Sequence, residues 1–136
     1  MLLLIQMDKG DKRMKLTNQE IYEKATEITV AFSNETKYIP VKLNFTIQKN
    51  LSVLSKLKEE IENNRIKIAS EYGKLNSEGT QFIIEKENRE KVEQELNDLF
   101  TMEQEIDIRT CSLSQIEGID LTMEQMQAIM FMITED

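Results

Sequence analysis

Apolar residues recur at steps of three and four along two stretches of the chain, which is the spacing of one helix face. The first stretch predicts a helix over about 18–33, with Ile21, Ala25, Ile28 and Phe32 on its buried side. The second begins near Pro40, a residue suited to a first helical turn, and ends at Gly73. Its apolar positions are Leu43, Ile47, Leu51, Leu54, Leu57, Ile61, Ile68 and Tyr72.

This second pattern predicts a rod of roughly 50 Å at about 1.5 Å per residue. Its start is ambiguous, because residues 37–47 also alternate between apolar and polar side chains and would fit a strand. The segment 73–80 is expected to be a loop, and "QFII" at 81–84 a short extended segment.

A third helix is predicted over about 86–104, with Val92, Leu96, Leu99 and Phe100 on one face. Because only a short connection joins the second and third helices, we expect them to fold back as an antiparallel hairpin. The segment "EIDIRT" at 105–110 alternates Ile106 and Ile108 and is the best strand candidate. Its partner would be either residues 14–16 or the segment near Tyr38 and Ile39.

Two helix starts have the same capping sequence. Thr17 with Glu20, and Thr122 with Gln125, each have the spacing of a capping box. An apolar staple is expected from Leu16 to Ile21 and from Leu121 to Met126. The last helix is apolar on most sides and should therefore be buried on two of them; its apolar residues are Met123, Met126, Ala128, Ile129, Met130, Phe131, Met132 and Ile133.

The predicted fold is mainly α: a capped N-terminal helix, a long antiparallel helical hairpin and a small C-terminal strand–helix closure, all in one domain over residues 14–136. Residues 1–13 differ from the rest, because "MLLLIQM" is apolar and "DKGDKR" is charged. Lys9-Gly10-Asp11 can be encoded by a purine-rich stretch similar to a bacterial ribosome-binding site. We therefore hypothesise that Met14 is the natural initiator and that 1–13 is a translated leader.

Composition limits the possible functions. The 136 residues carry a formal charge of −8, which argues against free-standing nucleic-acid binding and permits a basic partner. One cysteine and no histidine exclude a disulfide within the chain and a zinc site built on His and Cys, and indicate a reducing cytoplasm. No stretch approaches the roughly 18 apolar residues of a membrane span, so no membrane association is expected.

No catalytic, cofactor-binding or metal-ligating residue is predicted. Arg109 could activate the thiol of Cys111, but a lone cysteine beside a strand is usually a small core residue. The many carboxylates alternate with Lys and Arg on helical segments, which is typical of solvated faces. A carboxylate-dependent metal enzyme is kept as an unfavoured alternative.

Two sets of residues are candidates for a partner-binding surface. Methionine side chains are adaptable and are common at protein-binding surfaces; here they are Met123, Met126 and Met130. The acidic candidates on the predicted hairpin are Glu59, Glu62 and Glu93. The alternative for the methionines is a core helix that closes the base of the hairpin. The hairpin itself could also form a homo-oligomer or accept a partner helix.

The order of these elements resembles a family of small phage and prophage proteins from Firmicutes whose function is unknown. The resemblance rests on "KLTNQEIYEKA" after Met14, on the long segment 39–74, on "EIDIRTCSLSQIEGIDLT" and on the closing "MEQMQAIMFMI". It covers about 14–136 and implies a phage gene, expressed in a Gram-positive bacterial cytoplasm or built into a virion.

The function expected from these observations is that of a non-enzymatic phage accessory protein. It would bind another protein, with a host factor such as an antiphage-defence component as the leading candidate. The main alternative is a virion, tail-associated or assembly protein.

Overall fold

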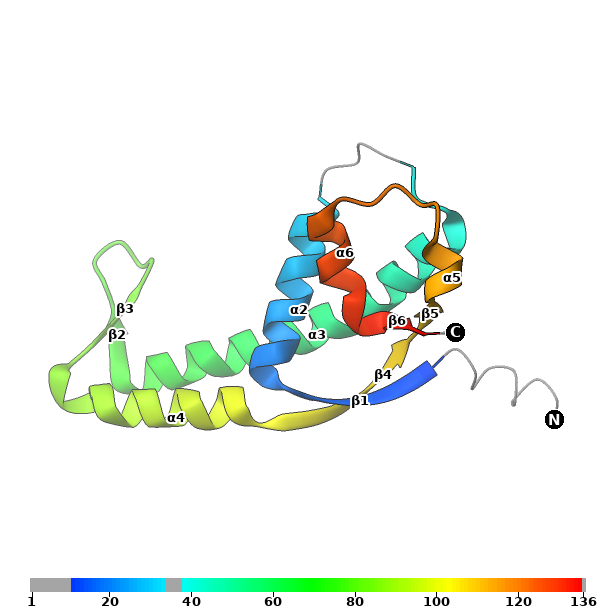
Figure 1. Ribbon diagram of the computed structural model, residues 1–136. Helices are drawn as coiled ribbons and strands as arrows, with labels where there is room; N and C mark the ends of the chain where they lie inside the picture. Colours follow the sequence, from blue (N-terminus) through cyan, green and yellow to red (C-terminus); the bar gives the residue numbers. More distant parts are fainter. Residues whose placement is uncertain (1–10, 34–37, 136) are drawn as a thin grey trace.

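The computed structural model describes residues 11–33 and 38–135 (Figure 1). Helices make up 63% of it, so the fold is mainly α, as predicted. In Figure 1 an arm extends from a more compact head. We use "arm" for residues 62–101 and "head" for the other described residues.

Helix α2 (Asn18–Ala31) begins at the predicted capping box. The backbone N–H of Glu20 donates to Thr17 Oγ1 at 3.1 Å, and the Thr17 N–H donates to the Glu20 carboxylate at 2.9 Å. The helix ends two residues earlier than predicted, where Ser33 Oγ donates to the Val30 carbonyl at 2.8 Å. The predicted stripe is buried at Ile21, Ala25 and Ile28 and half-buried at Phe32.

Helix α3 (Val41–Tyr72) starts directly after Pro40 and has 32 residues, about 48 Å at 1.5 Å per residue. The alternative of a strand is therefore wrong for 41–47; residue 37 lies outside the described residues. The helical spacing decides the conformation here, since it buries Leu43 and Ile47 and leaves Phe45 51% exposed, whereas a strand would place all three on one face.

The far end of the arm is a small β-hairpin. Strand β2 (Gly73–Leu75) pairs antiparallel with β3 (Phe82–Ile84), so the predicted loop at 73–80 is wrong for its first three residues, and the extended segment within 81–84 is confirmed. Gly73 ends α3 in an extended conformation with φ −138°. A side chain there would place Cβ 2.5 Å from Ile84 Cδ1 and 2.7 Å from the Ile83 carbonyl oxygen, so the close pairing requires glycine.

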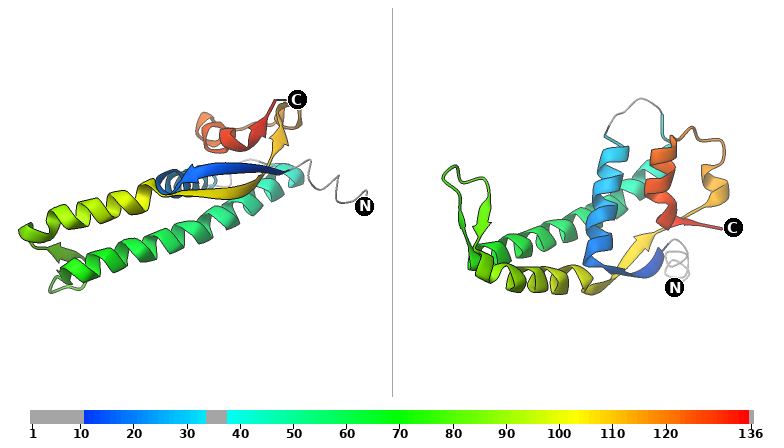
Figure 2. Two further views of the ribbon diagram at one scale, coloured as in Figure 1. Left: turned by 90° about the horizontal axis from the view of Figure 1, so that it is seen from below. Right: turned by 60° about the vertical axis from the view of Figure 1, so that its left-hand side comes forward.

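The chain returns along the arm as the 3₁₀ turn η1 (Lys86–Asn88) and helix α4 (Arg89–Thr101). Helix α4 lies beside the C-terminal part of α3 in every view (Figures 1 and 2). Val92 is buried between them. A side-chain hydrogen bond to Glu95 raises the pKa of Tyr72, and Asn88 Nδ2 donates to the Tyr72 carbonyl at 3.3 Å. The third helix was predicted to reach 104 but stops at Thr101, because the next residues form a strand.

That strand is β4 (Glu103–Arg109), which pairs antiparallel with β1 (Asp11–Thr17). The predicted pairing with residues 14–16 is confirmed, since Met14 lies opposite Ile106; residues 38–40 are not in a strand, so the alternative partner is wrong. One face of the pair buries Ile106 and Ile108. On the other face Arg13 Nε donates to Asp107 at 3.1 Å.

Residues 11–13, which the leader hypothesis placed before the domain, thus belong to β1. Residues 1–10 lie outside the described residues, and the position of the natural start stays a hypothesis.

The C-terminal part consists of β5 (Cys111–Ser112), α5 (Leu113–Ile116), α6 (Met123–Ile129), the 3₁₀ turn η2 (Met130–Met132) and β6 (Ile133–Thr134), with β5 and β6 parallel. The capping box at Thr122 is confirmed, with the Gln125 N–H donating to Thr122 Oγ1 at 3.0 Å. The expectation that this helix is buried on two sides is wrong. Ala128, Ile129 and Met132 face the core, but the opposite side is exposed.

Two buried asparagines join segments that are far apart in the sequence. The side chain of Asn50, which is 1% exposed, donates to the Arg109 carbonyl and accepts from the Arg109 N–H, both at 2.9 Å. At the first turn of α2, Asn18 Nδ2 donates to the Leu99 carbonyl at 2.8 Å, and the Asn18 N–H donates to the Met102 carbonyl at 2.8 Å. These contacts fix α3 against β4, and α2 against the end of α4.

Candidate functional site

The residues predicted for a partner-binding surface do not come together. The methionines lie on α6 and η2 in the head, next to α2, whereas Glu62 and Glu93 lie on the arm and Glu59 on α3 beside it (Figure 1). Met123 and Met130 are 78% and 58% exposed, but Met126 is half-buried and packs against the core. The structure therefore divides the methionines between surface and interior, and separates both from the acidic residues.

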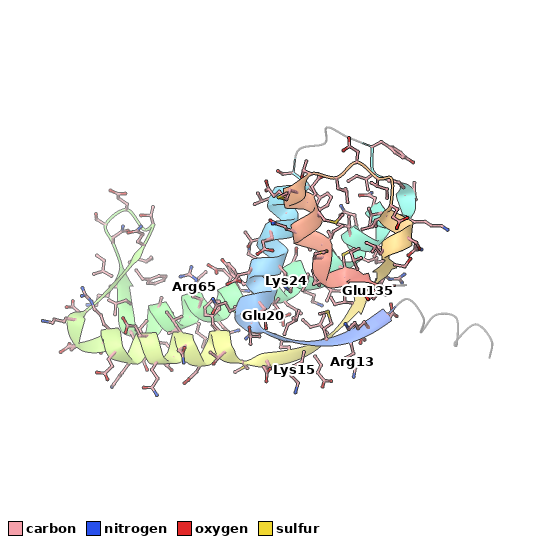
Figure 3. The ribbon with its side chains drawn as sticks, in the orientation of Figure 1. Arg13, Lys15, Glu20, Lys24, Arg65 and Glu135 are labelled. Atoms are coloured by element: carbon pink, nitrogen blue, oxygen red, sulfur yellow. The ribbon has the colours of Figure 1, made fainter. Side chains whose placement is uncertain are left out.

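Glu62 is held in a local network. Arg65 Nε lies 3.1 Å from both carboxylate oxygens of Glu62, and the Tyr22 hydroxyl donates to Glu62 Oε2 at 3.1 Å. Lys58 Nζ donates to Thr26 at 3.0 Å and lies 4.7 Å from the centre of the Tyr22 ring. Figure 3 shows Arg65 where the arm meets α2. Glu62 thus links α2 to α3 through Tyr22, and its charge is already paired with Arg65.

The protonation of this network follows from its contacts. The hydrogen bond from Arg65, followed by its charge, outweighs partial burial and lowers the pKa of Glu62. Burial and the neighbouring Glu62 raise the pKa of Tyr22. At neutral pH Glu62 is therefore ionised and Tyr22 is a neutral hydrogen-bond donor.

Glu93 takes part in a different feature, a groove of about 540 Å³ between α2 and α4. Tyr22, Leu96 and Phe100 supply its apolar surface, and the rings of Tyr22 and Phe100 meet edge to face with centroids 6.0 Å apart. The remaining lining residues are Gln19, Glu23, Glu93 and Asn97. We call this the α2–α4 groove. Within the part of the chain that is described, its lining has two carboxylates and no Lys or Arg.

A second groove of about 530 Å³ lies between the start of α3 and the segment around α5. Val41 and Phe45 are exposed at its edge, and Cys111 lines it while being only 6% exposed itself. The guanidinium carbon of Arg109 lies 5.6 Å from the centre of the Phe45 ring. Cys111 belongs to the core cluster, which agrees with its interpretation as a small buried residue.

The described residues contain no metal centre: across 11–33 and 38–135, no three Asp, Glu, His or Cys side chains are grouped so that they could hold an ion. Within the same ranges, no helix has the length and apolar character needed to cross a membrane. Glu59 is exposed on α3.

Comparisons with known proteins add no assignment. No family model, no curated protein and no solved structure matches the chain. The resemblance to phage proteins therefore stays an expectation from the sequence.

The α2–α4 groove was not predicted from the sequence, although part of its signal is there. Glu93, Leu96 and Phe100 follow the i, i+3, i+7 spacing of one helix face. Leu96 and Phe100 were predicted on the apolar face of the third helix, whereas Glu93 was predicted separately as an acidic surface residue. The contact of these α4 residues with Tyr22 depends on how α2 crosses the arm, because Tyr22 lies more than seventy residues earlier in the chain.

Proposed function

We propose that this protein is a non-enzymatic accessory protein that binds another protein through its arm. In this proposal the arm is the far part of the antiparallel hairpin expected for the second and third helices, and the segments from β4 to β6 form the closure at its base. In keeping with the resemblance, the protein would come from a phage and act on a host factor, such as an antiphage-defence component, in the cytoplasm of an infected bacterium.

The observation that carries this proposal is that apolar side chains are exposed along the arm and at its far end. Leu75 and Ile83, in the β2–β3 hairpin, are 56% and 57% exposed. Ile66 on α3 is 41% exposed. Exposed apolar side chains cost solubility, and a group of them on a projecting element is typical of a surface that another macromolecule covers. The head also exposes apolar side chains on α2 and α3, namely Val30, Val41, Phe45 and Val53. Leu75 and Ile83 differ from these because they lie on an element that projects from the rest of the molecule (Figure 1).

A quantitative pull-down tests the proposal. The full chain and its Leu75→Lys/Ile83→Lys variant are used as baits in lysate from phage-infected host cells. A host protein recovered in proportion to the bait, and lost with the variant, is the expected result. Leu113→Lys is the control, because Leu113 is 45% exposed but lies on α5 in the head.

Other outcomes would favour other functions. Recovery of phage structural proteins alone, together with stoichiometric peptides of this chain in purified particles, would replace the proposal with a virion or assembly role. Self-association that the Leu75→Lys/Ile83→Lys variant abolishes, measured by sedimentation velocity, would show instead that the arm joins copies of this chain.

A further inference from the structure

We propose that the α2–α4 groove binds a short basic segment of a partner protein: an apolar anchor side chain flanked by Lys or Arg. This inference rests on the proposed function, because it names the chemistry that a protein partner would present at the root of the arm. The tip of the arm would then supply a second contact with the same partner.

The first support is the apolar surface of the groove. Tyr22, Leu96 and Phe100 are all half-buried, so each keeps apolar surface in contact with solvent. Tyr22 and Phe100 meet edge to face, which leaves an aromatic face and an aromatic edge on the groove wall. A volume of about 540 Å³ is large enough for an anchor side chain and its immediate neighbours.

The second support is that the wall is held in place before any partner arrives. Tyr22 is fixed by its hydrogen bond to Glu62 and by Lys58 over its ring. Asn18 Nδ2 donates to the carbonyl of Leu99, so the first turn of α2 and the last turn of α4 cannot separate without breaking this partly buried hydrogen bond. A wall ordered in advance loses little conformational entropy on binding.

The third support is charge. Glu23 and Glu93 lie at the groove and are exposed, and no cation among its described lining residues neutralises them. Glu62 nearby is already paired with Arg65. The groove therefore complements Lys and Arg on a partner, and the net charge of −8 steers such a partner towards the protein. The same field repels the phosphates of a nucleic acid.

The test uses a fluorescently labelled 18-residue helical peptide of Leu and Lys, and a counterpart with Glu in place of every Lys. Binding is measured by fluorescence anisotropy at physiological salt, where long-range attraction is screened. The groove variant is Glu23→Lys/Glu93→Lys. The matched control, Glu60→Lys/Glu117→Lys, makes the same change in net charge at exposed positions outside the groove.

We expect the Leu/Lys peptide to bind the unchanged protein and the Leu/Glu peptide not to bind. The groove variant should weaken binding at least tenfold, and the control less than threefold. Leu96→Ala, which leaves the charge unchanged, should weaken binding about fivefold. Melting temperatures within a few degrees of the unchanged protein would show that each variant is folded.

Equal losses in the groove variant and the control would overturn the proposal, since they would show attraction to net charge alone. No effect of Leu96→Ala, or no binding of the Leu/Lys peptide to the unchanged protein, would also overturn it. These results would leave the proposed function untouched, because its test is the capture of a host protein and the loss of that capture when Leu75 and Ile83 are replaced.

Discussion

The buried side chain of Asn50 makes the sharpest prediction about stability. It is the one polar residue within the apolar stripe of α3 that is fully buried among the described residues, and it makes two hydrogen bonds of 2.9 Å with the backbone of Arg109. The amide of Asn50 therefore makes the two backbone hydrogen bonds that a further strand beside β4 would make with Arg109. Asn50→Ala removes both hydrogen bonds and leaves the Arg109 N–H and C=O without these partners.

The expected loss can be worked from these contacts. Each of the two hydrogen bonds contributes about 1 kcal/mol net, and leaving the Arg109 N–H without its partner costs about 1 kcal/mol more, the low end of the usual range because this bond is only partly buried. Alanine returns about 0.5 kcal/mol, because it is the better helix former. We therefore expect Asn50→Ala to lower the free energy of unfolding by about 2–3 kcal/mol.

Urea unfolding followed by far-UV circular dichroism measures this loss. Asn64→Ala is the control, because Asn64 lies on the same helix, is exposed, and bonds only to the Glu60 carbonyl of its own helix. The control should change the free energy of unfolding by less than about 0.5 kcal/mol. A loss below 1 kcal/mol for Asn50→Ala, or a loss equal to that of the control, would refute the assignment of Asn50 as the link between α3 and β4.

Three further predictions follow from the structure. Gly73→Ala should destabilise the β2–β3 hairpin by about 1–3 kcal/mol, because the new Cβ overlaps the Ile83 carbonyl; faster amide hydrogen exchange over 73–84 would show it, and unchanged exchange would contradict it. The pKa of Glu62 is lowered in the folded protein, so its ionised form stabilises the fold at pH values above its ordinary pKa of 4.5. This stabilisation is lost as the pH falls through the folded pKa. In Glu62→Gln the free energy of unfolding should therefore fall less steeply as the solution is acidified. Since Glu62 and Arg65 are partly exposed, we expect their pairing to contribute only about 0.5 kcal/mol to the free energy of unfolding. Parallel curves of this free energy against pH for the two proteins would refute the prediction. Millimolar Mg²⁺ or Mn²⁺ should leave the melting temperature unchanged. A shift of several degrees would instead favour the alternative function of a carboxylate-dependent metal enzyme.

Local sequence patterns predicted the helix starts and the strand. The capping boxes at Thr17 and Thr122 need only residues three positions apart, and the alternation of Ile106 and Ile108 needs only one strand with a buried face. Such features depend only on residues close together in the chain, so they can be recognised from the sequence without knowledge of long-range contacts.

Features that depend on contacts between distant segments could not be predicted in the same way. Asn50 was not among the predicted core positions, because its partner Arg109 is 59 residues away. The extended conformation of Gly73 depends on the approach of Ile83 and Ile84. The exposure of Met123 and Met130 depends on which side of α6 packs against the core.

The candidate site shows the same limit. Composition and spacing identified acidic residues on the arm, among them Glu93, but not the groove that gives Glu93 a neighbouring apolar surface. That surface exists only because α2 crosses the arm beside α4. Glu62 was predicted as part of a binding surface, and the structure pairs it with Arg65 and Tyr22 in a partly exposed network between α2 and α3.

The central claim is that the protein works by contacting another protein with its arm. Site-specific photocrosslinking in infected host cells tests it most directly, with benzoylphenylalanine placed at Ile83 on the arm or at Leu113 in the head. The account predicts a discrete crosslink to one protein from position 83 and none from position 113. No discrete crosslink from position 83, or the same crosslinks from both positions, would contradict it.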